Sequence, residues 1–265
     1  MLTAERKELL LQRLARDGRL VAKTMATELQ TSEDTIRRDL RELAAEGRLQ
    51  RVHGGALPSS PAMGNFAVRQ TIGTDAKAAV AREAATLVQP GQTVVIDGGT
   101  TALQLVQSLH PGLDATVITH SPTIAVALVE HPRIEVLLIG GRLFKHSIVT
   151  CGAIAAESIS GLHADAFFMG VTGVHPDSGL TTGDAEEAAM KRALAHRCAE
   201  TYVLASSEKI GAVSPHRVVE WSDITAVITD AGSDTRVLEA LRQQGIELRV
   251  AGRRADGQRE RDTPA

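Results

Sequence analysis

The chain has 265 residues, of which 43% are hydrophobic and 23% charged, so it is long enough for one small and one larger domain with a sizeable core. Aromatic residues make up only 2%, which disfavours single-stranded nucleic-acid binding by base stacking. The net charge is −3, but residues 1–56 carry 11 basic and 9 acidic side chains. A basic head on an acidic remainder fits a DNA-binding module attached to another domain.

Three short helices are predicted within residues 1–56. The first has a leucine stripe over residues 10–14 and ends at an Asp-Gly pair. The second spans about 21–29. Ser32 is a natural N-cap for the third helix, which runs to about Glu46 before a glycine ends it.

The third helix has an apolar face and a basic face. At about 100° per residue, Ile36, Leu40 and Leu43 form a narrow stripe for the core, whereas Arg38 and Arg41 lie almost opposite. The planar fork of arginine binds guanine edges and phosphates, so this is the geometry of a recognition helix in the major groove. The alternative is a solvated basic face without DNA contact.

Residues 47–55 (GRLQRVHGG) contain two short β-type runs and glycines, which are typical of a wing. The stretch TSEDTIRRDLRELAAEGRLQRVHGGA, residues 31–56, resembles the head of the DeoR family of bacterial repressors. This resemblance implies a winged helix-turn-helix that binds double-stranded operator DNA. Together with the helix geometry, it gives the predicted DNA contacts Ser32, Thr35, Arg37, Arg38, Arg41, Arg51 and His53.

The Pro-, Ser- and Gly-rich stretch 57–74 predicts a linker, and beyond it buried strands alternate with helices. Strands are expected at 93–97, 116–119, 135–139, 166–170, 201–205 and 226–229, with helices at 122–130, 185–198 and 235–244. Such alternation implies an α/β fold with a mainly parallel sheet covered on both faces. The predicted domains are 1–56 (winged helix-turn-helix), 57–74 (linker), 75–251 (α/β sensor) and 252–265 (disordered tail).

A glycine-threonine turn follows the first of these strands. The run Asp97-Gly98-Gly99-Thr100-Thr101 leads into a helix, so backbone N–H groups and two hydroxyls converge on a position that suits an anion. The alternative is a turn that is glycine-rich only for packing. Neither GxGxxG nor a P-loop is present, which disfavours a nucleotide ligand.

Other strand ends also lead into polar turns, and a parallel sheet gathers such turns along one edge, where ligands bind. The candidates there are Gly141, Gly170, Thr172, Gly173 and Lys209, with Lys77 just before the first body helix. The DeoR resemblance continues to about residue 251. It implies a ribose-5-phosphate-isomerase-like fold that senses a phosphorylated sugar or sugar alcohol. By that resemblance Lys77 and Lys209 hold the phosphate; the alternative is two exposed lysines.

Three further candidates lie where the helix at 185–198 begins. Asp184 and Glu187 either stabilise the helix start or accept hydrogen bonds from sugar hydroxyls, with Lys191 nearby. His120 stands where many DeoR relatives have asparagine. It is either a tolerated loop change or a residue that alters specificity or adds pH dependence.

Two functions are weighed: a metabolite-gated repressor of carbohydrate or sugar-phosphate genes, and a sugar-phosphate isomerase-like enzyme carrying a DNA-binding domain. Aldose–ketose isomerisation needs a positioned carboxylate base. The isomerase family has acids after the strand that matches 166–170, whereas residues 171–173 here have none. The isomerase glutamate aligns with Met190, although Glu186 and Glu187 are one turn away. We therefore predict a regulator and no enzyme, acting as a dimer or tetramer on repeated half-sites.

Targeting and metal signals are lacking in the sequence. MLTAERKELL places charges where a signal peptide needs an apolar run, and no apolar segment approaches the ~20 residues of a membrane span. We expect a cytoplasmic protein with no membrane contact. Cys151 and Cys198 lack zinc-ligand spacing and the nine histidines are scattered, so neither a metal nor a cofactor is predicted.

Overall fold

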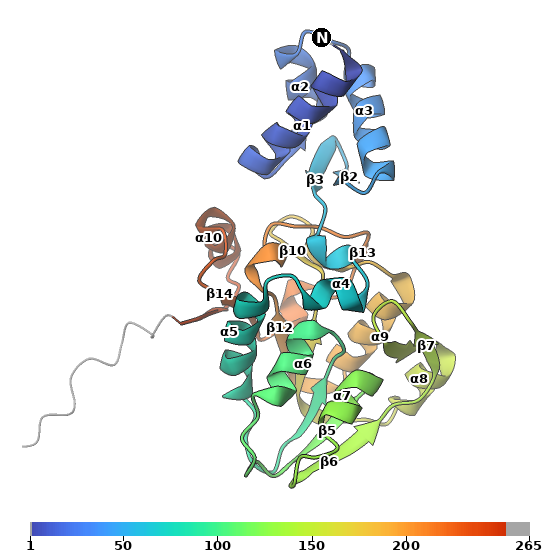
Figure 1. Ribbon diagram of the computed structural model, residues 1–265, viewed down its shortest axis with the longest axis vertical. Helices are drawn as coiled ribbons and strands as arrows, with labels where there is room; N and C mark the ends of the chain where they lie inside the picture. The colour runs from blue at the N-terminus through green and yellow to red at the C-terminus, as the bar shows by residue number, and fades with distance from the viewer. Residues whose placement is uncertain (1, 253–265) are drawn as a thin grey trace, which may run out of the picture.

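The computed structural model describes residues 2–252, in which a small N-terminal head stands on a larger α/β body (Figure 1). Apart from its first residue, the tail expected to be disordered, 252–265, lies outside the described residues. The head consists of α1 (Thr3–Asp17), β1 (Leu20–Val21), α2 (Ala22–Glu28), α3 (Glu33–Ala45), β2 (Leu49–Val52) and β3 (Gly55–Pro58). No helix within residues 2–252 is both long and apolar enough to cross a bilayer.

The head has the three helices and the wing that the sequence predicts. The α1 helix ends where Gly18 adopts a left-handed φ of 72°, and the Ser32 hydroxyl caps α3 by accepting the Thr35 N–H at 3.1 Å. The core face of α3, Ile36, Leu40 and Leu43, is buried as expected. Strands β1, β3 and β2 form a small antiparallel sheet that makes the wing.

An ion pair in the head core was not predicted. Asp39 is fully buried and lies against Arg6 of α1, which is 8% exposed. Arg6 Nε donates to Oδ2 of Asp39 at 2.5 Å and Nη2 donates to Oδ1 at 3.2 Å. The hydrogen bond to this carboxylate raises the pKa of Arg6. This two-point contact fixes α1 against α3.

The segment expected to be a linker is ordered and packed against the body. Its first two residues, 57 and 58, belong to β3, so we define the connector as residues 59–73. The connector contains η1 (Pro61–Met63) and α4 (Phe66–Gln70), and it leads into α5 (Thr74–Ala85). Phe66 is buried, and its N–H donates to the carbonyl of His146 at 3.0 Å. The composition of this segment suggested a loop, and the contacts that order it come from residues far away in the sequence, so no local pattern could reveal them.

A seven-stranded parallel sheet forms the centre of the body, which confirms the predicted fold class. Its order is β15-β14-β12-β9-β4-β5-β6. The strands are β4 (Thr93–Ile96), β5 (Ala115–Thr119), β6 (Ile134–Leu138), β9 (Ala164–Gly170), β12 (Cys198–Leu204), β14 (Ala226–Asp230) and β15 (Leu248–Ala251). Only β15 was not predicted.

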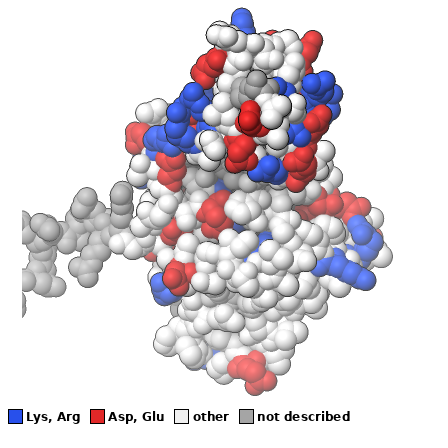
Figure 2. Space-filling view, turned by 45° about the horizontal axis from the view of Figure 1, so that its top comes forward, with Lys and Arg blue, Asp and Glu red and all other residues white. Residues whose placement is uncertain are grey.

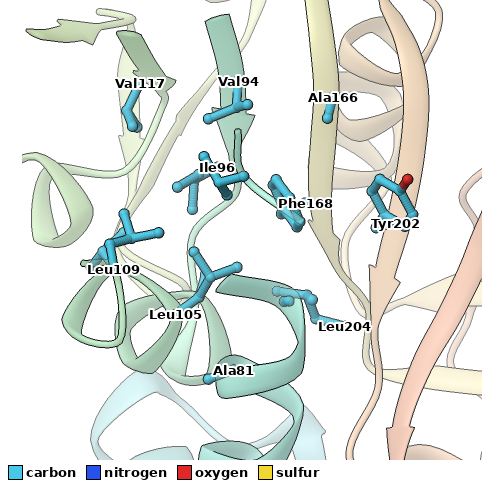
Figure 3. Packing of buried hydrophobic residues seen from close by; sticks show 14 of the residues in the cluster. Ala81, Val94, Ile96, Leu105, Leu109, Val117, Ala166, Phe168, Tyr202 and Leu204 are labelled. Carbon is cyan, nitrogen blue, oxygen red and sulfur yellow. The ribbon is translucent and has the colours of Figure 1, made fainter. Parts of the chain in front are cut away.

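Helices cover both faces of the sheet. One layer contains α5, α6 (Thr100–Gln107) and α7 (Pro122–Ala127), and the other contains α8 (Ala153–Ser158), α9 (Ala185–Ala195) and α10 (Thr235–Gln243). Successive residues of a strand point to opposite layers. Phe168 therefore packs in the cluster under α5 and α6 (Figure 3), while Phe167 packs in the cluster under α9. Burial on both faces explains the continuous apolar strands.

Short elements complete the carboxyl edge of the sheet. A hairpin of β7 (Arg142–Phe144) and β8 (Val149–Cys151) lies on one side. A second small sheet contains β10 (Gly173–His175), β11 (Gly179–Thr182) and β13 (His216–Arg217). Two 3₁₀ turns, η2 (Ser207–Lys209) and η3 (Trp221–Asp223), follow the ends of β12 and β13.

Candidate functional site

The outer face of α3 carries the predicted recognition residues. Arg37, Arg38 and Arg41 are exposed and, with Asp34 and Thr35, border one shallow hollow. Arg37 donates to Glu33 at 2.7 Å. In the part of the chain that the structure describes, neither Arg38 nor Arg41 forms an ion pair, so both guanidinium groups are available to a polyanion.

The wing places further basic groups beside α3. Arg51 on β2 and His53 at the tip of the β2–β3 turn are exposed. Gly54 completes that turn with a φ of 77°, which favours glycine. Charged side chains gather on the head, whereas most of the body surface seen in the same view is uncharged (Figure 2). The seven predicted DNA contacts therefore all lie on α3, its N-cap or the wing.

A cavity of about 490 Å³ lies at the carboxyl edge of the parallel sheet. The connector forms part of its wall through Ala62, Arg69 and Ile72. Ten of the residues predicted to bind an effector line it, namely Lys77, Gly98, Gly99, Thr100, Thr101, Gly170, Thr172, Glu187, Lys191 and Lys209. Residues from five separate segments are thus brought together at the carboxyl edge, where a parallel sheet gathers its ligand-binding groups.

The glycine-threonine turn forms one side of this cavity. Gly99 has a φ of 118°, and a Cβ at Gly98 would lie 2.2 Å from the Val149 side chain, so both positions require glycine. The α6 helix begins at Thr100, so its first N–H groups lie at the cavity. The buried Oγ1 of Thr101 has no hydrogen-bond partner among residues 2–252. This side of the cavity offers donors to an anion.

Buried cations also line the cavity. Lys77 and Lys209 are only 2% and 6% exposed, which rules out two solvated lysines. Lys77 belongs to the first turn of α5 rather than preceding it, and its Nζ donates to the carbonyls of Arg69, at 2.5 Å, and Ile72. Burial lowers the pKa of Lys77, and it lowers that of Lys209 to about 8 despite nearby Glu208. The cavity is therefore lined by lysine side chains that are largely shielded from water.

Asp97 lies behind the cavity wall instead of lining it. Oδ1 accepts from Gly98 N and His120 Nε2, both at 2.7 Å, and Oδ2 accepts from Gly170 N at 2.8 Å and from Lys191. Burial alone would raise the pKa of Asp97, but Lys191 and His120 outweigh it and lower that pKa well below its usual value. Asp97 thus orients the turn and Lys191 rather than contacting a ligand directly.

His120 is fully buried beside Asp97 and does not line the cavity. Its Nδ1 lies 2.9 Å from the carbonyl oxygen of Thr150. Both ring nitrogens therefore face hydrogen-bond acceptors, a carbonyl and a carboxylate. His120 lies in the bend after β5 and belongs to the packed wall, so both alternatives for this position, a tolerated loop change or an effect on specificity or pH dependence, stay open.

Three other candidates have mainly structural contacts. A Cβ at Gly141 would lie 3.0 Å from Ala155 Cβ, and one at Gly173 would lie 2.5 Å from the Ala212 carbonyl, so both glycines permit close packing away from the cavity. Asp184 caps α9, accepting the N–H groups of Glu186 and Glu187 at 3.0 Å. It borders an adjacent hollow of about 420 Å³.

Two charged cavity residues were missed by sequence reasoning. Arg69 comes from the segment expected to be a linker, and Glu208 precedes Lys209. The Oε2 of Glu208 and two guanidinium nitrogens of Arg69 are buried without a hydrogen-bond partner within the described chain. For Arg69, the only signal in the sequence is an arginine that lies between the apolar residues Phe66 and Ile72, and this signal is weak.

Comparisons with known proteins identify both parts of the chain. Residues 6–61 match the DeoR-like helix-turn-helix domain, and residues 73–231 match the DeoR C terminal sensor domain. The HTH-type transcriptional regulator GolR of Listeria innocua is 32% identical over 95% of this chain and 100% of its own length. The HTH-type transcriptional repressor GlcR of Bacillus subtilis is 31% identical over 94% and 97%. The ribose 5-phosphate isomerase A structure from Methanocaldococcus jannaschii is 19% identical over 51% of this chain and 54% of that one, with a TM-score of 0.39.

Proposed function

Since the chain belongs to the DeoR family of transcriptional regulators, we propose that it represses carbohydrate or sugar-phosphate genes and is switched by a phosphorylated sugar or sugar alcohol. Its curated relatives are named as regulators and repressors rather than enzymes, and it is a DNA-binding regulator. The observation that carries the effector proposal is that three buried lysines line the same cavity as the glycine-threonine turn.

The DNA proposal rests on α3 and the wing. Helix α3 enters the major groove with Arg38 and Arg41 toward the base edges or phosphates. Ser32, Thr35 and Arg37 lie at its N-terminal end, while Arg51 and His53 of the wing reach the adjacent backbone. The chain acts in the cytoplasm, where operator DNA is accessible.

Replacing Arg38 by alanine is expected to weaken operator binding about 5- to 150-fold, because one arginine contact to a base contributes about 1–3 kcal/mol. The measurement is fluorescence anisotropy with a duplex selected from random DNA by the wild-type protein. The matched control is Arg133→Ala, which removes an exposed body arginine paired with Asp114 at 3.0 Å. Wild-type affinity of the Arg38 variant would show that α3 is not used as assigned.

The effector proposal rests on charge and shape together. A phosphate group satisfies the donors at the start of α6 and the cations Lys77, Lys191 and Lys209 around it. Glu187 and Glu208 then supply acceptors for sugar hydroxyls at the same cavity. A nearby hollow bordered by Asp184 accommodates a longer polyol chain.

A thermal-shift screen tests the ligand class. Sugar phosphates and sugar alcohol phosphates should raise the unfolding temperature, whereas their unphosphorylated parents should not, because only the former use the cations. Thr101→Ala should weaken binding of the best compound about 5- to 30-fold by removing one hydroxyl contact. Thr86→Ala, at an exposed helix end, is the control. Equal stabilisation by the unphosphorylated parents would exclude a phosphate-specific site.

The proposal also includes the assembly of this chain into a homo-oligomer. Regulators that read repeated half-sites are symmetric assemblies, so a dimer or tetramer is expected. The apolar side chains of Val126, Val129, Leu137 and Leu138 are each about half or more exposed, near or on the edge strand β6. Light scattering of the purified protein measures the assembly, and a monomeric mass would contradict it.

A further inference from the structure

The connector is both the only covalent link between head and body and a wall of the effector cavity. The β3 strand of the wing ends at Pro58, whose carbonyl accepts the N–H of Val213 at 3.2 Å, and Ser59 bridges to the same residue. The next residue, Ser60, is buried and donates its hydroxyl to the carbonyl of Thr172, a cavity residue. The path from wing to cavity is therefore only two residues long.

Within this connector, Arg69 lacks an ionic partner. Its Nε and Nη2 are buried, yet neither donates a hydrogen bond to any group among residues 2–252. The backbone carbonyl of Arg69 accepts a hydrogen bond from Lys77 Nζ. Burial lowers the pKa of Arg69, and the charges of Glu187 and Asp97 offset this effect only in part. A desolvated guanidinium without a partner is destabilising, so its presence calls for a functional explanation.

The groups around Arg69 indicate what its partner is. The nearby side chains of Lys77 and Lys209 cannot accept a hydrogen bond, and although Glu187, Glu208 and Asp97 are carboxylates at or behind the same cavity, none accepts one from the buried Nε or Nη2 of Arg69 within residues 2–252. The glycine-threonine turn, which lines the same cavity, offers backbone N–H donors and the Oγ1–H of Thr101, which has no partner among residues 2–252. Donors lining one cavity leave a place for an acceptor with several oxygens, and a guanidinium fork matches a phosphate.

We infer that Arg69 binds the anionic group of the effector directly, and that this contact ties the connector to the body when the cavity is occupied. The inference rests on the proposed function, since it requires that an anionic ligand enters this cavity. The connector directly follows β3 of the wing, so holding the connector against the body restricts the orientation of the head relative to the body. Arg69, which would respond to a ligand in the cavity, thus belongs to the connector that attaches the head to the body.

The first test needs no ligand. Arg69→Met removes the unpartnered charge but keeps the length of the side chain, so the ligand-free protein should melt at a higher temperature than the wild type. Arg82→Met, which replaces an exposed arginine of α5, is the control and should change the melting temperature little. A lower melting temperature for Arg69→Met alone would mean that Arg69 stabilises the fold, and the inference would fall.

The second test uses ribose 5-phosphate, glucose 6-phosphate, fructose 6-phosphate, glycerol 3-phosphate and inorganic phosphate as probes of the full-length protein. The best binder should bind Arg69→Met about 10- to 100-fold more weakly than the wild type, as expected on losing a charge-assisted pair. Hydrogen exchange of residues 59–72 should slow on binding in the wild type but not in Arg69→Met at saturation. Thr101→Ala should recover full protection once saturated.

The outcomes separate the two ideas. Unchanged affinity in Arg69→Met, or full protection of residues 59–72 in that variant at saturation, overturns the role of Arg69 while leaving the phosphate site intact. If no probe binds the wild type, the proposed ligand class fails, whereas the melting comparison between Arg69→Met and Arg82→Met still decides whether the charge of Arg69 destabilises the ligand-free fold.

Discussion

Replacing Asp97 by alanine is expected to destabilise the body by about 3–5 kcal/mol, which is the usual cost of leaving one member of a buried ion pair uncompensated. Asp97 is fully buried and accepts hydrogen bonds from Lys191, His120 and two backbone N–H groups. Without it, Lys191 stays buried with only Glu187, 3.4 Å away. Since the stability of a domain is itself only about 5–15 kcal/mol, this loss is large.

The single tryptophan provides the measurement for Asp97→Ala. Trp221 packs against the body core, so its fluorescence during urea unfolding reports the body. Asp114→Ala is the matched control, since Asp114 pairs with Arg133 on the surface and such pairs contribute about 0–1 kcal/mol. Adding Lys191→Met to Asp97→Ala should recover part of the loss. An unfolding midpoint close to that of the wild type would show that Asp97 does not organise this wall.

The pH dependence of Asp97 has a defined sign. Its pKa in the folded protein is lower than in the unfolded chain, because Lys191 and His120 favour the carboxylate against the effect of burial. The stabilisation is therefore present above the unfolded-state pKa and is lost as the pH falls toward the folded-state pKa. The stability difference between the wild type and Asp97→Ala should accordingly shrink in acid.

Asp39→Ala should unfold the head while leaving the body folded. The change leaves Arg6 in the core without its two-point partner, at a cost of about 3–5 kcal/mol. A head of this size has little stability beyond that amount. Circular dichroism should therefore show lost helix at a denaturant concentration where Trp221 fluorescence is still native, and operator binding should disappear.

Glu42→Ala is the control for Asp39→Ala, because it removes a carboxylate from the same helix. Glu42 is exposed and pairs with Lys7 at 2.9 Å, so its removal should cost no more than about 1 kcal/mol. Coincident loss of helix and of native fluorescence in Asp39→Ala would contradict independent unfolding of the head. A fully helical Asp39→Ala head would contradict the importance of the pair.

Local patterns predicted most of the head and the sheet. The faces of α3 follow from the spacing of Ile36, Leu40 and Leu43, and the Ser32 cap from residue type alone. Continuous apolar runs located six of the seven parallel strands. The glycine-threonine turn was recognised because strand, glycines and helix follow one another within a few residues. Each of these features depends on neighbours in the sequence.

Other predictions went wrong where distant segments meet. Asp97 was expected to touch a ligand, but Lys191, 94 residues away, and His120 turn it into a support for the wall. Gly141 and Gly173 resemble ligand-binding glycines, yet each avoids a clash with another segment. The loop-like composition of residues 57–74 gave no sign that Phe66 is buried and that Arg69 enters the cavity.

By itself, the sequence determined the helices of the head and six of the seven strands of the parallel sheet, which face of α3 is basic, and that parallel strand ends would gather at one edge. Hydrophobic periodicity and capping are short-range properties, so a single chain of letters contains them. Only the tertiary structure decided which charges are paired. Arg6 pairs with Asp39 across 33 residues, whereas the buried Nε and Nη2 of Arg69 have no hydrogen-bond partner among residues 2–252. The energy of a buried charge depends on the groups that folding brings around it, and that surrounding is absent from any local stretch of sequence.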